Sequence, residues 1–129
     1  MTKKLSMFAA IAAVVVLMTS CMKTEATVDV QVKQNGQPAS GVTVYKFDNS
    51  MGEGATTIKV NADGSAKTNA AGVAHFDLKS PDDFPPSSLG VEEANTFYFA
   101  TFDEDDSRNG FVAVTIRTGE KKTVTIEME

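Results

Sequence analysis

The sequence has few of the residues on which common catalytic and metal sites depend. Among its 129 residues there is no tryptophan, one cysteine (Cys21) and one histidine (His75). A lone cysteine excludes an intrachain disulfide and a cysteine-based zinc site. The sequence also lacks the Gly-x-Ser-x-Gly, phosphate-loop and His-Glu-x-x-His motifs, and nothing around His75 has the form of a catalytic triad. These absences indicate a protein that is not an enzyme and that needs no cofactor.

Basic residues are also scarce. Lysine and arginine number 12 against 17 acidic residues, which gives a net charge of −5. Loss of residues 1–20 would remove Lys3 and Lys4 and change the net charge to −7 (−5 − 2). Phosphates repel an acidic domain, so nucleic acid is not an expected partner. The same charge argues against a domain that lies flat on anionic lipid through a basic patch.

The first 20 residues have the layout of a secretory signal peptide. Lys3 and Lys4 precede an apolar run of 14 residues, 5–18, which only Ser6 interrupts. A helix needs about 20 residues to cross the hydrocarbon core of a bilayer. The run is therefore predicted to be a cleaved signal and not a permanent membrane span.

The end of this segment, Leu17-Met18-Thr19-Ser20-Cys21, resembles the lipobox of bacterial lipoproteins, with Met18 in the usual leucine position. The resemblance covers about the first 21 residues. It implies that Cys21 receives a diacylglycerol, becomes the N-terminus and anchors the protein in the cell envelope, with the outer membrane as the expected location. The alternative is an ordinary secretory signal with an incidental cysteine. The expected organisation is a signal peptide (1–20), a lipidated tether (21–26) and one domain (27–129).

The remainder of the chain has the periodicity of an all-β protein. Alternating or β-branched runs recur at short intervals, separated by glycine, asparagine, aspartate and proline, and helical spacing is absent. The turn residues at 118–121 predict that the last two strands form a hairpin. Seven short strands suit a single Ig-like or prealbumin-like β-sandwich, with a closed barrel as the alternative. The predicted strands are 28–33, 42–48, 56–60, 73–78, 97–102, 111–117 and 123–128.

Residues 30–78 resemble the carboxypeptidase-regulatory-like and transthyretin-like (prealbumin-like) sandwich domains of bacterial envelope proteins. The resemblance rests on the turn Asn35-Gly36-Gln37-Pro38-Ala39-Ser40-Gly41 and on Thr68-Asn69-Ala70-Ala71-Gly72-Val73-Ala74-His75-Phe76, which has asparagine where the families have aspartate. Asn69 can form an Asx-turn and Gly72 can adopt positive φ. The related hydroxyisourate hydrolases end in Tyr-Arg-Gly-Ser, whereas this chain ends Ile126-Glu127-Met128-Glu129, which excludes that activity.

One acidic stretch, 103–110, is the densest cluster of oxygen ligands in the sequence. Calcium takes six to eight oxygens, and Asp103, Asp105, Ser107 and Asn109 could supply several of them. The spacing is not that of an EF-hand. The alternative is a solvated hairpin tip that keeps sheet edges from associating.

Three other features carry weaker hypotheses. His75 alternates with Ala74 and Phe76, so it is expected on an outer face as a plain surface residue. The long connection 79–96 either caps one end of the sandwich or lines a ligand surface. Glycan binding would need exposed aromatic rings, which Tyr45, Tyr98 and Phe84 could supply.

Pilus and adhesin sandwich modules suggest one further idea, an internal Lys-Asn isopeptide bond. Lys33 or Lys46 would need an asparagine on a strand beside a buried acid. The predicted late strands contain no asparagine, so this bond is not expected.

Taken together, the sequence predicts a non-catalytic envelope lipoprotein whose sandwich domain binds an envelope protein or glycan. The alternative from another class is a structural or assembly component, such as an adhesin or fimbria subunit or an accessory part of an outer-membrane complex. An enzyme with a dispersed site is the third hypothesis. The sequence does not determine the oligomeric state.

Overall fold

The computed structural model describes residues 25–48, 54, 56, 58–79, 83–84 and 94–129. Cys21 and most of the 79–96 connection, including Leu89 and Val91, lie outside the described residues. No helix among the described residues is long and apolar enough to span a bilayer. The elements are β1 (Glu25–Gln34), β2 (Gln37–Pro38), β3 (Thr43–Asp48), the 3-10 helix η3 (Lys59–Asn61), β4 (Gly64–Lys67), β5 (Val73–Lys79), β6 (Ala94–Phe102), β7 (Arg108–Arg117) and β8 (Lys121–Met128).

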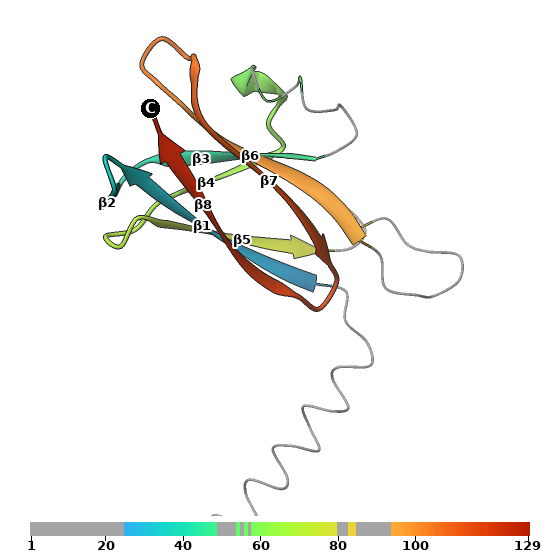
Figure 1. Ribbon diagram of the computed structural model, residues 1–129. Coiled ribbons are helices and arrows are strands. Elements are labelled where there is room, and N and C mark those ends of the chain that lie inside the picture. The colour runs from blue at the N-terminus through green and yellow to red at the C-terminus, as the bar shows by residue number, and fades with distance from the viewer. Residues whose placement is uncertain (1–24, 49–53, 55, 57, 80–82, 85–93) are drawn as a thin grey trace, which may run out of the picture.

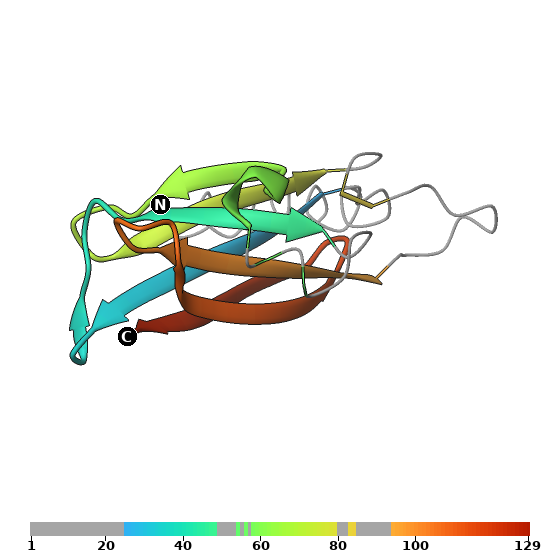
Figure 2. The ribbon, with the colours of Figure 1, turned by 90° about the horizontal axis from the view of Figure 1, so that it is seen from above.

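The strands form two four-stranded sheets that face each other as a sandwich (Figures 1 and 2). In the first, here called the β1 sheet, β1 pairs antiparallel with β5 and β2 and parallel with β8. In the second, the β3 sheet, the strand order is β4-β3-β6-β7 and all pairs are antiparallel. The predicted all-β sandwich is confirmed.

The core lies between the sheets and follows the alternation of the sequence. Ala74, Phe76 and Leu78 on β5 are buried, as predicted. Phe76 meets Phe99 from the opposite sheet, with ring centroids 4.8 Å apart. Full burial of a large apolar side chain stabilises the fold by about 1.5–3 kcal/mol, so this interior supplies most of the stability of a domain without a disulfide.

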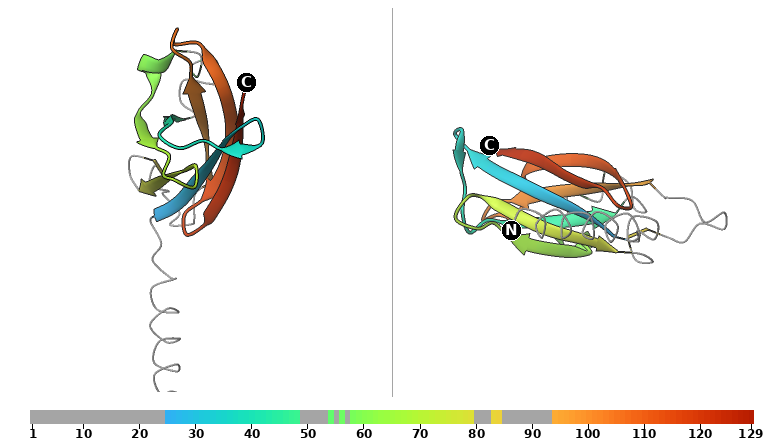
Figure 3. Two further views of the ribbon diagram at one scale, coloured as in Figure 1. Left: turned by 90° about the vertical axis from the view of Figure 1, so that its left-hand side faces the viewer. Right: turned by 90° about the horizontal axis from the view of Figure 1, so that it is seen from below.

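The two ends of the sandwich are formed by different segments of the chain. At the Glu25 end, β1 begins opposite Lys79, and the Gly119 amide donates to the Glu25 carbonyl at 2.6 Å. At the far end, the Glu129 amide donates to the Asn109 carbonyl at 2.9 Å, and the turn 103–107 joins β6 to β7. Figures 1 and 3 show this turn and the C-terminus at the end opposite the start of β1. The chain therefore enters the domain at one end and presents a different set of loops at the other.

Two predicted turn signals are confirmed at the backbone level. Asn35 and Gly36 both have positive φ, 54° and 77°, and they join β1 to the short strand β2. Asn69 forms the expected Asx-turn, since its Oδ1 accepts a hydrogen bond from the Ala71 amide at 2.9 Å. Gly72 has φ of 78°, and a side chain there would meet the Val32 carbonyl oxygen at 2.9 Å. Only glycine fits that position without strain.

The strand predicted at 56–60 is wrong. Residue 58 is a bend and 59–61 form η3, while Ile58 and Val60 are 52% and 87% exposed. The β-branched composition of this segment favours a strand, but the edge of β3 is already paired with β4. The strands β2 and β4, both short, were not predicted.

The hairpin predicted across 118–121 is also wrong. A turn does form, with the Glu120 amide donating to the Arg117 carbonyl at 3.1 Å. It carries the chain from the β3 sheet to the β1 sheet, where β8 pairs in parallel with β1 from Thr27↔Lys121 to Gln34↔Met128. That ladder satisfies the second edge of β1 and places Ile126 in the core, which a local hairpin with β7 would not do.

Candidate functional site

The outer side of the β3 sheet is aromatic where the outer side of a sandwich is usually polar. Tyr45 on β3 meets Phe102 on β6 edge to face at 5.5 Å, and Phe47 lies 6.5 Å from the same ring. Tyr98 and Phe111, on β6 and β7, stack with centroids 5.9 Å apart. Phe47 is buried and the other four rings are half-buried. These five residues are here called the aromatic face.

Two cations hold the segment around η3 against this face. Lys59 Nζ lies 5.3 Å from the Tyr45 ring and 2.9 Å from Asp106 Oδ1. The hydrogen bond that Lys59 donates to Asp106 raises the pKa of Lys59, so its ammonium stays charged over the ring. Arg108 stacks on Phe111 at 4.6 Å. Cation–π contacts of this kind favour a fixed position for the segment.

Arg108 also reaches the segment directly, because its Nη1 donates to Thr56 Oγ1 at 2.5 Å. Thr56 is fully buried, whereas Ile58 and Val60, a few residues later, point into solvent. The two aliphatic side chains are therefore exposed on a segment that is tethered to the domain. The sequence pattern does not indicate this surface, because the β-branched residues here favour a strand.

Two of the four predicted calcium ligands, Asp103 and Asn109, have a side-chain oxygen engaged in hydrogen bonds. Asp103 Oδ1 accepts hydrogen bonds from the amides of Asp105 and Ser107 at 2.9 and 3.0 Å, which closes the turn. Asn109 Oδ1 accepts from Thr101 Oγ1 at 2.7 Å. Within the described ranges, no group of three or more His, Cys, Asp or Glu side chains is arranged to hold a metal ion. Calcium binding stays a prediction.

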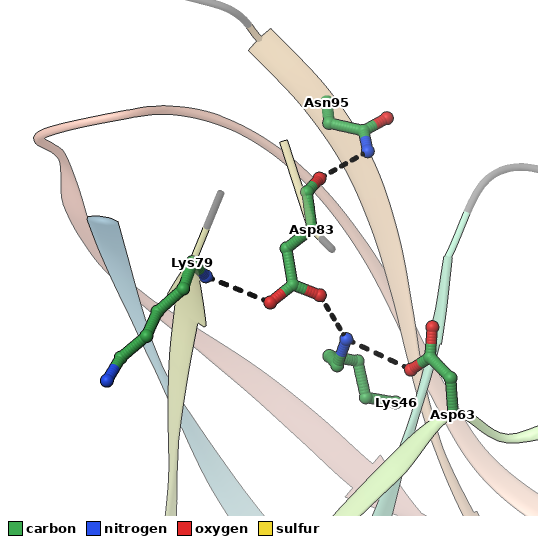
Figure 4. A network of polar contacts seen from close by, with 5 residues as sticks. All are labelled: Lys46, Asp63, Lys79, Asp83 and Asn95. Atoms are coloured by element: carbon green, nitrogen blue, oxygen red, sulfur yellow. Dashed lines mark hydrogen bonds and ion pairs between the residues drawn. The ribbon is translucent and has the colours of Figure 1, made fainter. Parts of the chain in front are cut away.

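A second polar cluster, centred on Asp83, lies near the Glu25 end (Figure 4). Lys46 Nζ lies 2.6 Å from Asp83 Oδ1 and 3.0 Å from Asp63 Oδ1. Asp83 Oδ2 accepts from the Lys79 amide at 2.9 Å, and its carbonyl oxygen accepts from Asn95 Nδ2 at 2.9 Å. The Lys46 and Asp83 side chains are only 10% and 15% exposed. This cluster ties β3, β5 and β6 to the 79–96 connection.

The charge of Lys46 follows from its surroundings. Burial alone lowers the pKa of an amine, but hydrogen bonds and attraction from Asp83 and Asp63 outweigh it, and the pKa of Lys46 is raised. Its Nζ also lies 5.3 Å from the Phe97 ring. A protonated amine is not a nucleophile, so the geometry makes Lys46 a structural cation.

The isopeptide bond was not expected because the predicted late strands contain no asparagine, and that prediction of the strands is wrong. β6 begins at Ala94 and β7 at Arg108, so Asn95 and Asn109 do lie within late strands. Their side chains bond Asp83 and Thr101, while Lys33 lies on β1 opposite Glu127. Asp83 contacts both Lys46 and Asn95, so the sequence argument against a Lys46–Asn95 bond does not hold.

The described part of the 79–96 connection behaves as a cap. Phe84 is 1% exposed and meets Phe97 edge to face at 5.8 Å. It belongs to the core, so of the three aromatic residues expected to serve a glycan, only Tyr45 and Tyr98 lie on the aromatic face.

His75 lies on the outer face of the β1 sheet, as predicted, but it has two acidic neighbours that the sequence pattern did not indicate. Its Nδ1 is 2.6 Å from Asp29 Oδ1 and its Nε2 is 3.0 Å from Asp77 Oδ1. Asp29 stands opposite His75 in the β1–β5 ladder. Hydrogen bonds to the carboxylates of Asp29 and Asp77 raise the pKa of His75 above its ordinary value of 6.5.

This geometry predicts a pH dependence of stability. Because the folded-state pKa is raised, the cluster stabilises the fold fully below about pH 6.5, and the contribution is lost as pH rises through the folded pKa. His75→Gln is expected to flatten the stability profile above about pH 6.5, measured as the urea midpoint at each pH. Parallel profiles for the two proteins would contradict the expectation.

Comparison with known proteins does not assign the chain to a family. No family model matches the chain, and no curated protein matches it. Among solved structures it is similar to the Bacillus anthracis TIE protein, with a TM-score of 0.48 and 10% identity over 82% of this chain and 16% of that one. A DUF3823 family protein from Parabacteroides merdae has a TM-score of 0.48 and 13% identity, over 83% of this chain and 47% of that one. A variant of the shaft pilin SpaA from Lactobacillus rhamnosus GG has a TM-score of 0.48 and 10% identity, over 84% of this chain and 52% of that one. The chain thus spans about half or less of the length of these structures.

Proposed function

We propose that this chain is a non-catalytic binding module, held at a bacterial envelope membrane by lipid on Cys21. In this proposal its contact surface is the aromatic face together with the exposed residues Ile58 and Val60. The partner is a protein or glycan of the envelope.

The observation that supports this proposal best is the apolar character of a surface that the sandwich core does not need. The core between the sheets is already formed by other residues, yet four half-buried rings and two exposed aliphatic side chains lie outside it. Exposed apolar surface beside aromatic rings and arginine is typical of interaction sites. Arginine is enriched in such sites along with tyrosine and phenylalanine, and Arg108 stacks on Phe111.

The position of the proposed anchor is compatible with a contact surface that faces away from the membrane. Cys21 precedes Glu25 by four residues, a reach of about 14 Å at most. A lipid on Cys21 would keep the Glu25 end close to the bilayer and leave the far end facing away from it. Two or more acyl chains give stable attachment.

The proposal is tested by a photo-crosslinking residue at Val60 in the full chain in intact cells. We expect discrete adducts from Val60 and none from the same residue at Thr125, an exposed position on the β1 sheet. The variant Cys21→Ser should lose fatty-acid labelling, leave the membrane fraction and lose the Val60 adducts.

Each other result has a definite meaning. Equal adducts from both positions would refute a specific contact surface. Adducts with a second copy of the chain would favour the structural or assembly role. Membrane retention of an unlabelled Cys21→Ser protein would refute the lipid anchor.

A further inference from the structure

We propose that the partner segment is a basic polypeptide with apolar side chains, and that it docks at the far end across Ile58, Val60 and the acidic turn 103–106. This inference rests on the proposed function, because it names the chemistry of the partner for part of the same contact surface.

The apolar half of the docking surface is tethered to the domain at two points. Ile58 and Val60 flank Lys59, which is fixed between the Tyr45 ring and Asp106. The preceding Thr56 is bound by Arg108. Ile58 and Val60 are the large apolar side chains that the described residues leave exposed. A partner that covers them gains apolar burial without first ordering the segment, which limits the entropy lost on binding.

The acidic half lies beside it. The ion pair between Lys59 and Asp106, 2.9 Å long, joins the η3 segment to the turn between β6 and β7. Figure 3 shows the two segments at the same end of the sandwich. Asp103, Glu104 and Asp105 are exposed, and none of the ion pairs between described residues uses them. After Lys59 neutralises Asp106, three carboxylates remain on the turn that this ion pair joins to the η3 segment.

This combination selects among the classes of partner. A neutral glycan stacks on ring faces and gains nothing from three carboxylates, while nucleic acid and anionic lipid are repelled. Lysine or arginine side chains complement the turn, and apolar side chains between them cover Ile58 and Val60. Electrostatic complementarity of this kind sets specificity and association rate, and burial supplies the affinity.

The test uses the full processed chain in phosphatidylcholine nanodiscs, with empty nanodiscs as the background. The probe is a short fluorescent peptide that alternates lysine with valine, followed by anisotropy at low and at physiological salt. Two matched peptides replace lysine by glutamate or valine by serine. A chitin oligosaccharide is the glycan probe. If the chain does not enter nanodiscs, the anchor has failed, and the titration is repeated in plain buffer to test the partner chemistry separately.

We expect the lysine-valine peptide to bind. The affinity of each other probe should be lower by a factor of about ten or more, as loss of one or two apolar contacts implies. Ile58→Ser with Val60→Ser, and separately Asp105→Lys, should each weaken binding by a similar factor. Thr125→Lys, on the other sheet, should leave it unchanged. Equal binding of the lysine-serine peptide would reduce the effect to charge alone and overturn the proposal. Preference for the oligosaccharide would overturn it as well.

Discussion

Replacement of Phe84 by alanine is expected to lower the free energy of unfolding by about 3–5 kcal/mol. The ring is 1% exposed and packs edge to face on Phe97, at 5.8 Å between centroids. Loss of the ring removes both its burial and its aromatic contact and leaves a cavity at the Glu25 end of the core. Because small domains have a stability of about 5–15 kcal/mol, the variant should melt many degrees lower.

The measurement is urea unfolding of the full chain and of two variants. Val60→Ala removes an aliphatic group from a side chain that is 87% exposed and should change the free energy of unfolding by less than about 0.5 kcal/mol. A Phe84→Ala cost below about 1 kcal/mol would mean that the 79–96 connection does not cap the core.

Replacement of Lys46 by methionine is expected to destabilise the fold by a comparable amount, about 3–5 kcal/mol, because it leaves Asp83 poorly solvated and without its cation. Asp83 is 15% exposed and lies 2.6 Å from Lys46 Nζ in the native chain. Methionine has a similar length, so the loss reports mainly the missing charge, including its cation–π contact with Phe97.

A compensating substitution separates charge from packing. Adding Asp83→Asn should recover much of the loss at neutral pH, since an amide oxygen can still accept from the Lys79 amide. If the double variant is no more stable than Lys46→Met at neutral pH, the ion pair is not the source of the effect.

These two residues also show where sequence patterns stop being informative. Phe84 lies in a segment without strand periodicity, and its ring was considered for a surface role. Lys46 alternates with Tyr45 and Phe47, which blurs the inward set of β3. Lys46 is buried against Asp83 and Phe97, and Phe84 is buried against Phe97. Asn95 in turn holds Asp83. In each case a partner comes from a distant part of the chain.

The residues of the aromatic face also lie on three separate predicted strands, so no local pattern shows that they share one surface. Tyr45 and Tyr98 were recognised as exposed candidates, but Phe102, Phe111 and Arg108 were not joined to them. Only the registers Tyr45↔Ala100 and Ala100↔Phe111 bring these strands together on one surface.

By itself the sequence determined which segments extend and where most turns fall. Alternation marks strands because side chains in a strand point to opposite faces, and the positive φ at Asn35, Gly36 and Gly72 is a local property of those residues. The tertiary structure decided which strands pair. β8 joins β1 instead of β7, and Ile58 and Val60 face solvent because β4 already pairs with β3. Strand pairing depends on contacts distant in sequence, and no local pattern encodes which edge remains free.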